Sequence, residues 1–305
     1  MKRLVLSGLL LCSACGRQEP VPAAAPREAA SYPLSALKGE DALREASLFV
    51  ALAGKPGLPP GGQRAAWIKD QLAGMGVPAE LDAFRDSSPG GIQAFTNVVV
   101  KFPGKQPGVI ILAAHHDLKT GIPSFVGAND SGSGVGLLLA LAPILKGGAG
   151  TGPSVWLAFL DGEECQVNYG PNDGLHGSRH MAAGLVEAGQ ARQVTAFILL
   201  DMVGDRDLTV TIPRNGAPAL MSRVFQAAEK CGVRGRFSLS DHAVLDDHQP
   251  FLDAGIPAVD LIDFDYGSSP GLNDYWHTSA DTIDKLSADS LETVGRVVLQ
   301  MLNQI

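Results

Sequence analysis

The sequence predicts an α/β protein: a three-layer α/β/α sandwich in which a mixed, mostly parallel central sheet lies between two layers of helices. Several short hydrophobic runs are rich in β-branched residues and nearly continuous, which is typical of strands buried on both faces. Segments between these runs carry apolar residues at helical spacing. The chain has 305 residues, of which 45% are hydrophobic and 18% are charged, the composition of a globular protein.

The expected strands alternate with the expected helices. We expect strands at 97–102, 109–114, 155–160, 197–200, 208–212 and 258–262. We expect helices at 63–75, 135–145 and 290–302. Because only a short segment with the pair Pro103-Gly104 separates the first two strands, we expect those two to form an antiparallel hairpin.

The N-terminus has the layout of an export signal. Lys2 and Arg3 precede an apolar run at 4–11, and small residues follow it. The run is too short to span a bilayer. Small residues before Cys15 resemble the bacterial lipoprotein signal, so we expect an exported protein, anchored through a lipidated Cys15 and facing the periplasm or the cell exterior. The alternative is a soluble N-terminal helix. The expected organisation is a signal at 1–15, a flexible tether at 16–32 and a single domain at 33–305.

Charge and cysteine content exclude some classes of function and leave others open. The 24 basic and 32 acidic residues give a net charge of −8, and no cluster of Lys and Arg appears. Nucleic-acid binding is therefore disfavoured. Once the signal is removed, Cys165 and Cys231 remain, and they either pair in an oxidising compartment or stay as two thiols.

Residues with metal-binding side chains follow four of the expected strands. In open α/β sheets, ligands bind beyond the carboxyl ends of the strands, so these side chains should meet at one edge. So many carboxylates beside histidines would repel one another without a cation, and mixed histidine and carboxylate ligation suits zinc. The residues are His115, Asp117, Asp161, Glu163, Glu164, Asp201 and Asp263.

Each element also has a plainer interpretation. His115 can offer a ring nitrogen that Asp117 orients, or the pair can belong to an ordinary loop. The glycine-rich stretch 127–134 either caps the helix that follows or brings Asp130 to a metal near that helix N-terminus. Glu163 and Glu164 point differently, so one can bind a metal while the other transfers protons.

The order of these elements resembles metallopeptidase family 28, which contains zinc aminopeptidases and glutaminyl cyclases on one fold. The resemblance spans about Gly61 to the C-terminus and includes His277-Thr278. It implies a zinc exopeptidase-like fold and makes 33–305 a zinc-dependent catalytic domain. It also makes Glu163 the acid/base and Asp117 the partner of a ligand. The implied zinc ligands are His115, Asp130, Glu164, Asp201 and His277.

Several stretches are more similar to the glutaminyl cyclases than to the peptidases. They are the insert 169–173, the segment 246–251 and the pair Trp276-His277, whereas 129–134 is closer to the peptidases. The cyclase resemblance implies one zinc held by Asp130, Glu164 and His277. It implies a proton relay through Asp201 and Asp246, and a pocket lined by Trp276 and by Tyr169, which stands where mammalian cyclases carry a tryptophan.

Three functions follow as hypotheses. The first is cyclisation of an N-terminal glutamine of peptides or proteins to pyroglutamate, with loss of ammonia and one zinc. The second is a di-zinc aminopeptidase in which Asp130 bridges the ions, His115 and Asp201 complete the sites and Glu163 activates water. The third is a binding protein that kept the fold and lost catalytic activity. Loss of a metal ligand or of Glu163 would indicate such a protein, but all of these residues are present.

Overall fold

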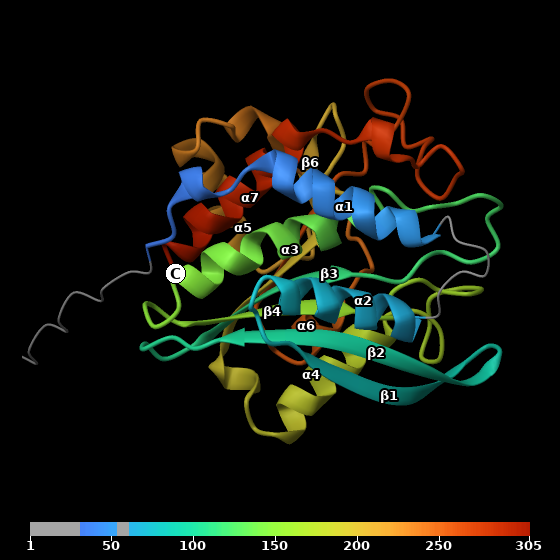
Figure 1. Ribbon diagram of the computed structural model, residues 1–305, viewed down its shortest axis with the longest axis horizontal. Helices are drawn as coiled ribbons and strands as arrows, with labels where there is room; N and C mark the ends of the chain where they lie inside the picture. The colour runs from blue at the N-terminus through green and yellow to red at the C-terminus, as the bar shows by residue number, and fades with distance from the viewer. Residues whose placement is uncertain (1–30, 54–60) are drawn as a thin grey trace, which may run out of the picture.

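The computed structural model describes residues 31–53 and 61–305, which form a three-layer α/β/α sandwich around a six-stranded mixed sheet (Figure 1). The expected fold class is confirmed. The predictions for the signal at 1–15, for most of the tether at 16–32 and for lipidation of Cys15 lie outside the described residues. In sheet order, the strands are β1 (Glu80–Ser88), β2 (Gly91–Phe102), β4 (Ser154–Leu160), β3 (Val109–His115), β5 (Val194–Asp201) and β8 (Ala258–Ile262).

The predicted hairpin between 97–102 and the strand from Val109 is wrong. β4 lies between β2 and β3, running antiparallel to β2 and parallel to β3. The hairpin partner of β2 is β1, and Ser88 lies opposite Gly91 across the turn. The residues of β1 are exposed or half-buried except for Ser88, so this strand does not appear among the continuous hydrophobic runs. A short connection limits how far apart two strands can lie, but it does not make them neighbours. Another hydrophobic strand can still insert between them.

Helices cover both faces of the sheet, and successive strand residues alternate between the two hydrophobic cores. Ile110 and Leu112 of β3 pack in the larger core, whereas Ile111 and Ala113 pack in the smaller one. The larger core lies under α1 (Gly39–Ala53), α2 (Gly61–Gly74), α3 (Gly132–Gly147), α5 (Pro218–Lys230) and α7 (Ala288–Leu302). The smaller core lies under α4 (His176–Glu187) and α6 (Gln249–Asp253). The helices expected at 63–75, 135–145 and 290–302 correspond to α2, α3 and α7.

The segment expected as a strand at 208–212 lies outside the main sheet. It contains β6 (Val210–Ile212), which pairs in parallel with β7 (Phe237–Leu239) in a separate two-stranded sheet. β6 also contacts β8, at the edge of the main sheet.

Glycines let α3 approach its neighbours closely. A Cβ at Gly134 would collide with the backbone carbonyl of Leu200, and a Cβ at Gly136 would lie 2.5 Å from the carbonyl oxygen of Ala42 in α1. The first turn of α3 therefore packs directly on the end of β5. This close packing places Asp130, just before α3, near Asp201 at the end of β5.

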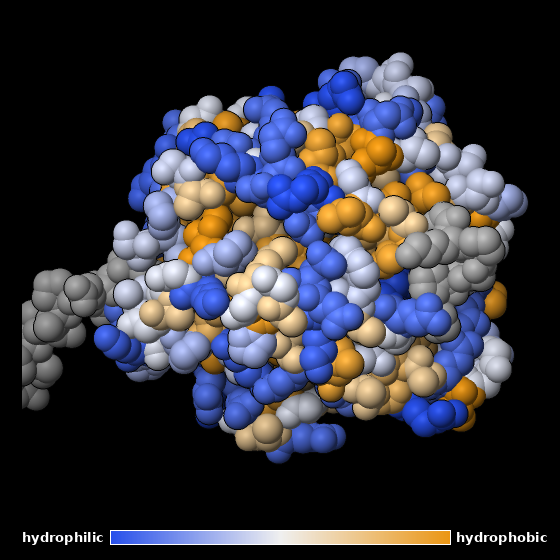
Figure 2. Space-filling view, in the orientation of Figure 1, coloured by the Kyte–Doolittle hydropathy of each residue, from blue (hydrophilic) through white to orange (hydrophobic). Residues whose placement is uncertain are grey.

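Among the described residues, no helix is long and apolar enough to cross a membrane. Figure 2 shows one face on which hydrophobic and hydrophilic side chains are interspersed.

The two cysteines of the described residues do not pair. Cys165 is buried, Cys231 is half-buried, and both are free thiols.

Candidate metal centre and active site

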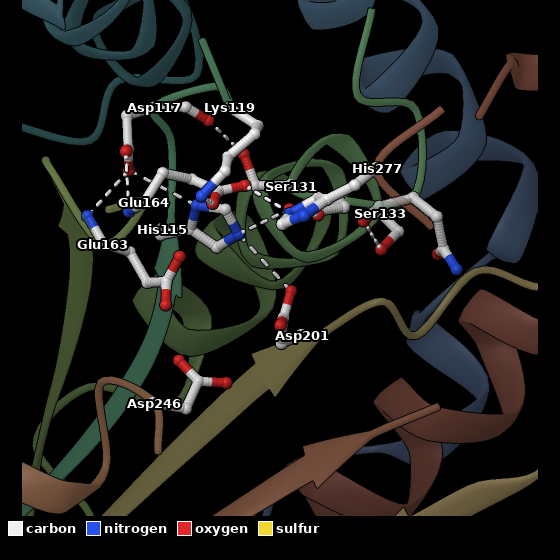
Figure 3. Close-up of polar contacts among 12 residues, drawn as sticks. His115, Asp117, Lys119, Ser131, Ser133, Glu163, Glu164, Asp201, Asp246 and His277 are labelled. Carbon is white, nitrogen blue, oxygen red and sulfur yellow. Dashed lines mark hydrogen bonds and ion pairs between the residues drawn. The ribbon is translucent and has the colours of Figure 1, made fainter. Parts of the chain in front are cut away.

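The carboxyl ends of β3, β4 and β5 meet at one edge of the sheet because these strands are parallel neighbours. β3 ends at His115, β5 ends at Asp201, and the loop after β4 carries Glu163 and Glu164. Figure 3 shows these side chains gathered around His115, with His277 entering from the opposite side on the segment between β8 and α7.

Asp130 lies between the two histidines and offers one oxygen to each. Its Oδ1 lies 3.0 Å from His115 Nε2, and its Oδ2 lies 3.2 Å from His277 Nε2. His115 Nε2 is also 3.4 Å from Asp201 Oδ1, and His277 Nε2 is 3.0 Å from Glu164 Oε1. The result is two candidate metal-binding groups that share Asp130: one with His115 and Asp201, the other with Glu164 and His277.

The residues present fit a zinc ion. Each group offers one imidazole nitrogen and two carboxylates, a donor set that zinc accepts. Asp201 Oδ1 and Glu164 Oε2 are buried and accept no well-formed hydrogen bond; each has one long contact of 3.4 Å, to His115 Nε2 and to Lys119 Nζ respectively, so both oxygens are available as ligand atoms. A buried carboxylate oxygen without a close partner is unfavourable unless it faces a cation.

The electrostatics of the site also require positive charge. Burial lowers the pKa of His277, but hydrogen bonds with Asp130 and Glu164 outweigh it and raise that pKa to about 9. His115 behaves in the same way: contacts with Asp117, Asp130 and Asp201 overcome burial and raise its pKa well above the usual value. Without a metal, two imidazolium ions would therefore compensate the carboxylates. A divalent cation supplies the same two charges.

Asp117 holds the loop that carries the two glutamates. Its Oδ1 accepts the backbone N–H of Glu163 and its Oδ2 accepts that of Glu164, each at 3.0 Å. His115 Nδ1 lies 3.3 Å from Asp117 Oδ1. One buried carboxylate thus orients both a histidine on β3 and the segment after β4.

Glu163, Asp201 and Asp246 direct their carboxyl groups toward a common space (Figure 3). Burial raises the pKa of Glu163 well above its usual value, and the charges of Glu164 and Asp246 raise it further. Burial likewise raises the pKa of Asp246 well above its usual value, with additional effects of Asp260 and Asp201. A carboxyl group whose pKa is shifted from its usual value toward neutral pH exchanges a proton more readily, so it is suited to proton transfer.

A small cavity of about 120 Å³, which we call the reaction pocket, opens onto these groups. The indole of Trp276 stacks on the His277 ring, with centroids 4.1 Å apart. The pocket is therefore acidic on one side and aromatic or aliphatic on the other. The non-acidic side is formed by Tyr169, Val244, Leu245, Ile262, Phe264 and Trp276.

Two of the acids expected at this edge bind backbone amides instead. Asp161 accepts the N–H of Thr96, and Asp263 accepts the N–H groups of Thr209 and Asp265. Neither belongs to a candidate metal-binding group among the described residues.

Two further residues, which the motifs in the sequence do not indicate, support the site. Lys119 Nζ lies 3.4 Å from Glu164 Oε2, and its position two residues after Asp117 was the available signal. The buried carboxylate of Asp281 accepts the backbone N–H groups of Asn129 and Asp130 at 2.8 and 3.2 Å. It therefore fixes the backbone at Asp130, and no sequence periodicity indicates this role.

The backbone is strained at two points of the site. Met202, directly after Asp201, has φ +46°, and His277 has φ +53°. Left-handed backbone at residues other than glycine costs about 1–3 kcal/mol and tends to occur at functional sites. Both strained residues stand at or beside a candidate ligand.

Comparisons with known proteins place this chain in a family and a fold that fit the geometry of the site. Residues 97–302 match Peptidase family M28. A glutaminyl-peptide cyclotransferase-like protein of Bos taurus is 32% identical over 282 residues, covering 81% of this chain and 70% of that protein. The solved structure of an Acidobacteriales bacterium glutaminyl cyclase has 35% identity and a TM-score of 0.80, covering 95% of this chain and 98% of that one. A Zn-dependent exopeptidase of Parabacteroides distasonis shares the fold at 24% identity, with a TM-score of 0.76 and coverage of 90% and 100%.

Proposed function

Since the chain belongs to Peptidase family M28, we propose that it is a zinc-dependent glutaminyl-peptide cyclotransferase, which converts the N-terminal glutamine of a peptide to pyroglutamate and releases ammonia. The observation that carries the proposal is the similarity to a glutaminyl cyclase over nearly the whole of both chains. The reaction pocket supports it, because Glu163 and Asp246 face one another beside a cavity that fits one small side chain.

Zinc held by Asp130, Glu164 and His277 would supply Lewis acidity to the side-chain amide carbonyl of the glutamine. Asp201 and Asp246 hold the α-amino group of the substrate. Trp276 and Tyr169 enclose the glutamine side chain and exclude water from it. These contacts bring the α-nitrogen close to the amide carbon.

Glu163 transfers the proton. It takes a proton from the α-amine as the bond between the α-nitrogen and the amide carbon forms, and it donates that proton to the amide nitrogen as the old carbon–nitrogen bond breaks. Ammonia leaves, no water is consumed, and Glu163 returns to its starting state. The raised pKa of Glu163 suits a group that both accepts and releases a proton in one cycle.

The test is ammonia release from a peptide with an N-terminal glutamine, measured for the wild type and for Glu163→Gln. We expect the substitution to lower kcat by about 10²–10⁴-fold, the usual contribution of general acid–base catalysis, while zinc content stays unchanged. A Glu163→Gln protein with wild-type kcat would refute the role assigned to Glu163. Absence of ammonia release by the zinc-loaded wild type would refute the function.

A second candidate function is that of a di-zinc aminopeptidase. The observation that favours it is that the two candidate metal-binding groups share Asp130, as such an enzyme requires. In that enzyme, Asp130 would contribute to the binding of both ions, and Glu163 would act as the base for a water molecule. Hydrolysis of a leucine anilide, together with two zinc ions per chain, would favour the aminopeptidase. Ammonia release with one zinc ion favours the cyclase.

We also propose export and anchoring through a lipidated Cys15. The support is the sequence alone: a basic start, a short apolar run and small residues before the cysteine. Mass spectrometry of the N-terminal peptide, from protein purified with the bacterial membrane fraction, tests this. A protein found only without lipid would refute the anchoring.

A further inference from the structure

A second and larger cavity lies beside the reaction pocket. It has a volume of about 510 Å³ and runs between α4 and α6, on one face of the sheet. Tyr169 and Leu245 line both cavities, so the two share a wall. We call the larger cavity the α4–α6 groove. The reaction pocket is too small for more than one side chain, so the rest of a peptide substrate must lie outside it.

The α4–α6 groove is apolar and exposed. Leu245 and Val186 are 48% and 51% exposed and line the same cavity, so they belong to one apolar surface and are not scattered single residues. Ala183 on α4 and Pro250 on α6 complete the apolar surface between them. Its volume lies in the range of about 300–1,000 Å³ that is common for ligand-binding clefts.

The length of the groove fits a short stretch of extended peptide. Arg179 and Val186, both in its lining, are separated by about 10 Å along α4, at 1.5 Å per helical residue. An extended chain advances about 3.3 Å per residue, so the groove accommodates about three residues.

The two ends of the groove differ in charge. At the end near Tyr169, Arg179 Nη1 donates a hydrogen bond to the carbonyl oxygen of Gly170 at 2.6 Å, so the guanidinium is held against the protein. At the other end, Glu187 and Asp253 are exposed carboxylates. An acidic residue of a bound peptide is therefore disfavoured at the far end.

We propose that the α4–α6 groove binds the residues that follow the N-terminal glutamine of the substrate, about positions two to four, in extended form, and that it selects apolar side chains. The proposal rests on the proposed function, which places the glutamine itself in the reaction pocket. The occupant is the substrate's own chain, because the groove shares Tyr169 and Leu245 with that pocket.

The experiment compares three amidated peptides: Gln-Gly, Gln-Leu-Phe-Leu and Gln-Gly-Ser-Gly. Ala183→Trp fills the groove from an exposed position on α4, and Ala188→Trp makes the same change at an exposed position outside the groove lining. We expect the wild type to have a KM about tenfold lower for Gln-Leu-Phe-Leu than for Gln-Gly-Ser-Gly, since burying one apolar side chain is sufficient for such a factor.

Ala183→Trp should abolish this preference and leave kcat and KM for Gln-Gly within about twofold of the wild type. Ala188→Trp should keep the preference. Equal KM values for the two longer peptides in the wild type would overturn the proposal, as would an equal effect of Ala183→Trp on all three. A dimer that Ala183→Trp dissociates in analytical ultracentrifugation, with the peptide preference unchanged, would also overturn it. If Ala183→Trp does not fold by circular dichroism, Val186→Ser replaces it, with the same expected result.

A binding measurement separates this proposal from the proposed function. If no glutamine peptide releases ammonia, the proposed function fails, and the groove is then tested by fluorescence anisotropy with labelled Gln-Leu-Phe-Leu. Binding to the wild type that Ala183→Trp weakens about tenfold would support an apolar peptide site. Equal binding to both proteins would overturn it.

Discussion

Tyr169 donates a hydrogen bond from its hydroxyl group to Oε1 of Glu163, at 2.7 Å. The tyrosine comes from the loop between β4 and α4, where the resemblance to mammalian cyclases predicted only a pocket-lining side chain in place of a tryptophan. A hydrogen bond to an ionised carboxylate is stronger than one between neutral groups. Tyr169 therefore fixes the orientation of the proposed acid/base as well as lining the reaction pocket.

We predict that Tyr169→Phe lowers kcat for ammonia release by about 10–100-fold, the loss expected from one hydrogen bond to a charged group. KM for a glutamine peptide should stay within about twofold, because the aromatic ring that contacts the substrate remains. Tyr32→Phe makes the same change far from the pocket and should behave as the wild type. An unchanged kcat in Tyr169→Phe would show that the hydrogen bond does not matter for turnover.

A second prediction separates the two candidate metal-binding groups. His277→Ala removes the nitrogen from the group that contains Glu164, and His115→Ala removes it from the group that contains Asp201. For the cyclase with one zinc, His277→Ala should lose the ion on dialysis, whereas His115→Ala should keep one per chain. Elemental analysis of the dialysed proteins measures this. Two ions in the wild type, with one lost in each variant, would favour the aminopeptidase instead.

The sequence located much of this site because strand ends are easy to recognise. His115, Glu164 and Asp201 follow continuous hydrophobic runs, and parallel strands bring such ends to one edge. His277 has no such signal, since it lies in an irregular segment, and only the order of the motifs pointed to it. The same strand-end rule wrongly included Asp161 and Asp263, because a carboxylate that binds backbone amides looks identical in sequence to one that binds a metal.

The sheet order and the smaller helices were harder to predict. β4 separates β2 from β3, and nothing in a six-residue connection indicates an intervening strand that comes later in the chain. α6 has five residues, too few to show a helical period, although it forms one wall of the α4–α6 groove. The structure, and not the sequence, therefore shows the second cavity.

A third prediction tests the packing of α3, which positions Asp130. Gly136→Ala should destabilise the protein by about 1–3 kcal/mol, because the added Cβ would overlap the backbone of α1 at Ala42 and Ala46. Gly147→Ala is the matched control on the same helix, since nothing lies within 4 Å of a Cβ there. Urea unfolding measures both. Equal stability of the two variants would show that α1 and α3 do not require the close approach.

The last prediction concerns stability at low pH and depends on His248. The ring is fully buried, and its Nε2 accepts a hydrogen bond from Asn215 Nδ2 at 2.9 Å. The orientation of the Asn215 amide is fixed because its Oδ1 accepts the backbone N–H of Val244. Nε2 is therefore unprotonated in the folded protein, and burial lowers the pKa of His248 to about 4.

In the unfolded chain, the pKa of His248 returns to about 6.5. Between these two values the unfolded state binds a proton that the folded state does not, so stability falls as the pH drops below about 6.5 and stops falling near 4. Going from pH 7 to pH 5 should reduce the free energy of unfolding by about 2 kcal/mol through this residue alone. Urea unfolding of the wild type and of His248→Gln at both pH values isolates that contribution, because other titrating groups affect both proteins equally. Since the glutamine side chain has no proton to gain, His248→Gln should lose about 2 kcal/mol less than the wild type between the two pH values, and an equal loss would mean that His248 is charged in the folded state.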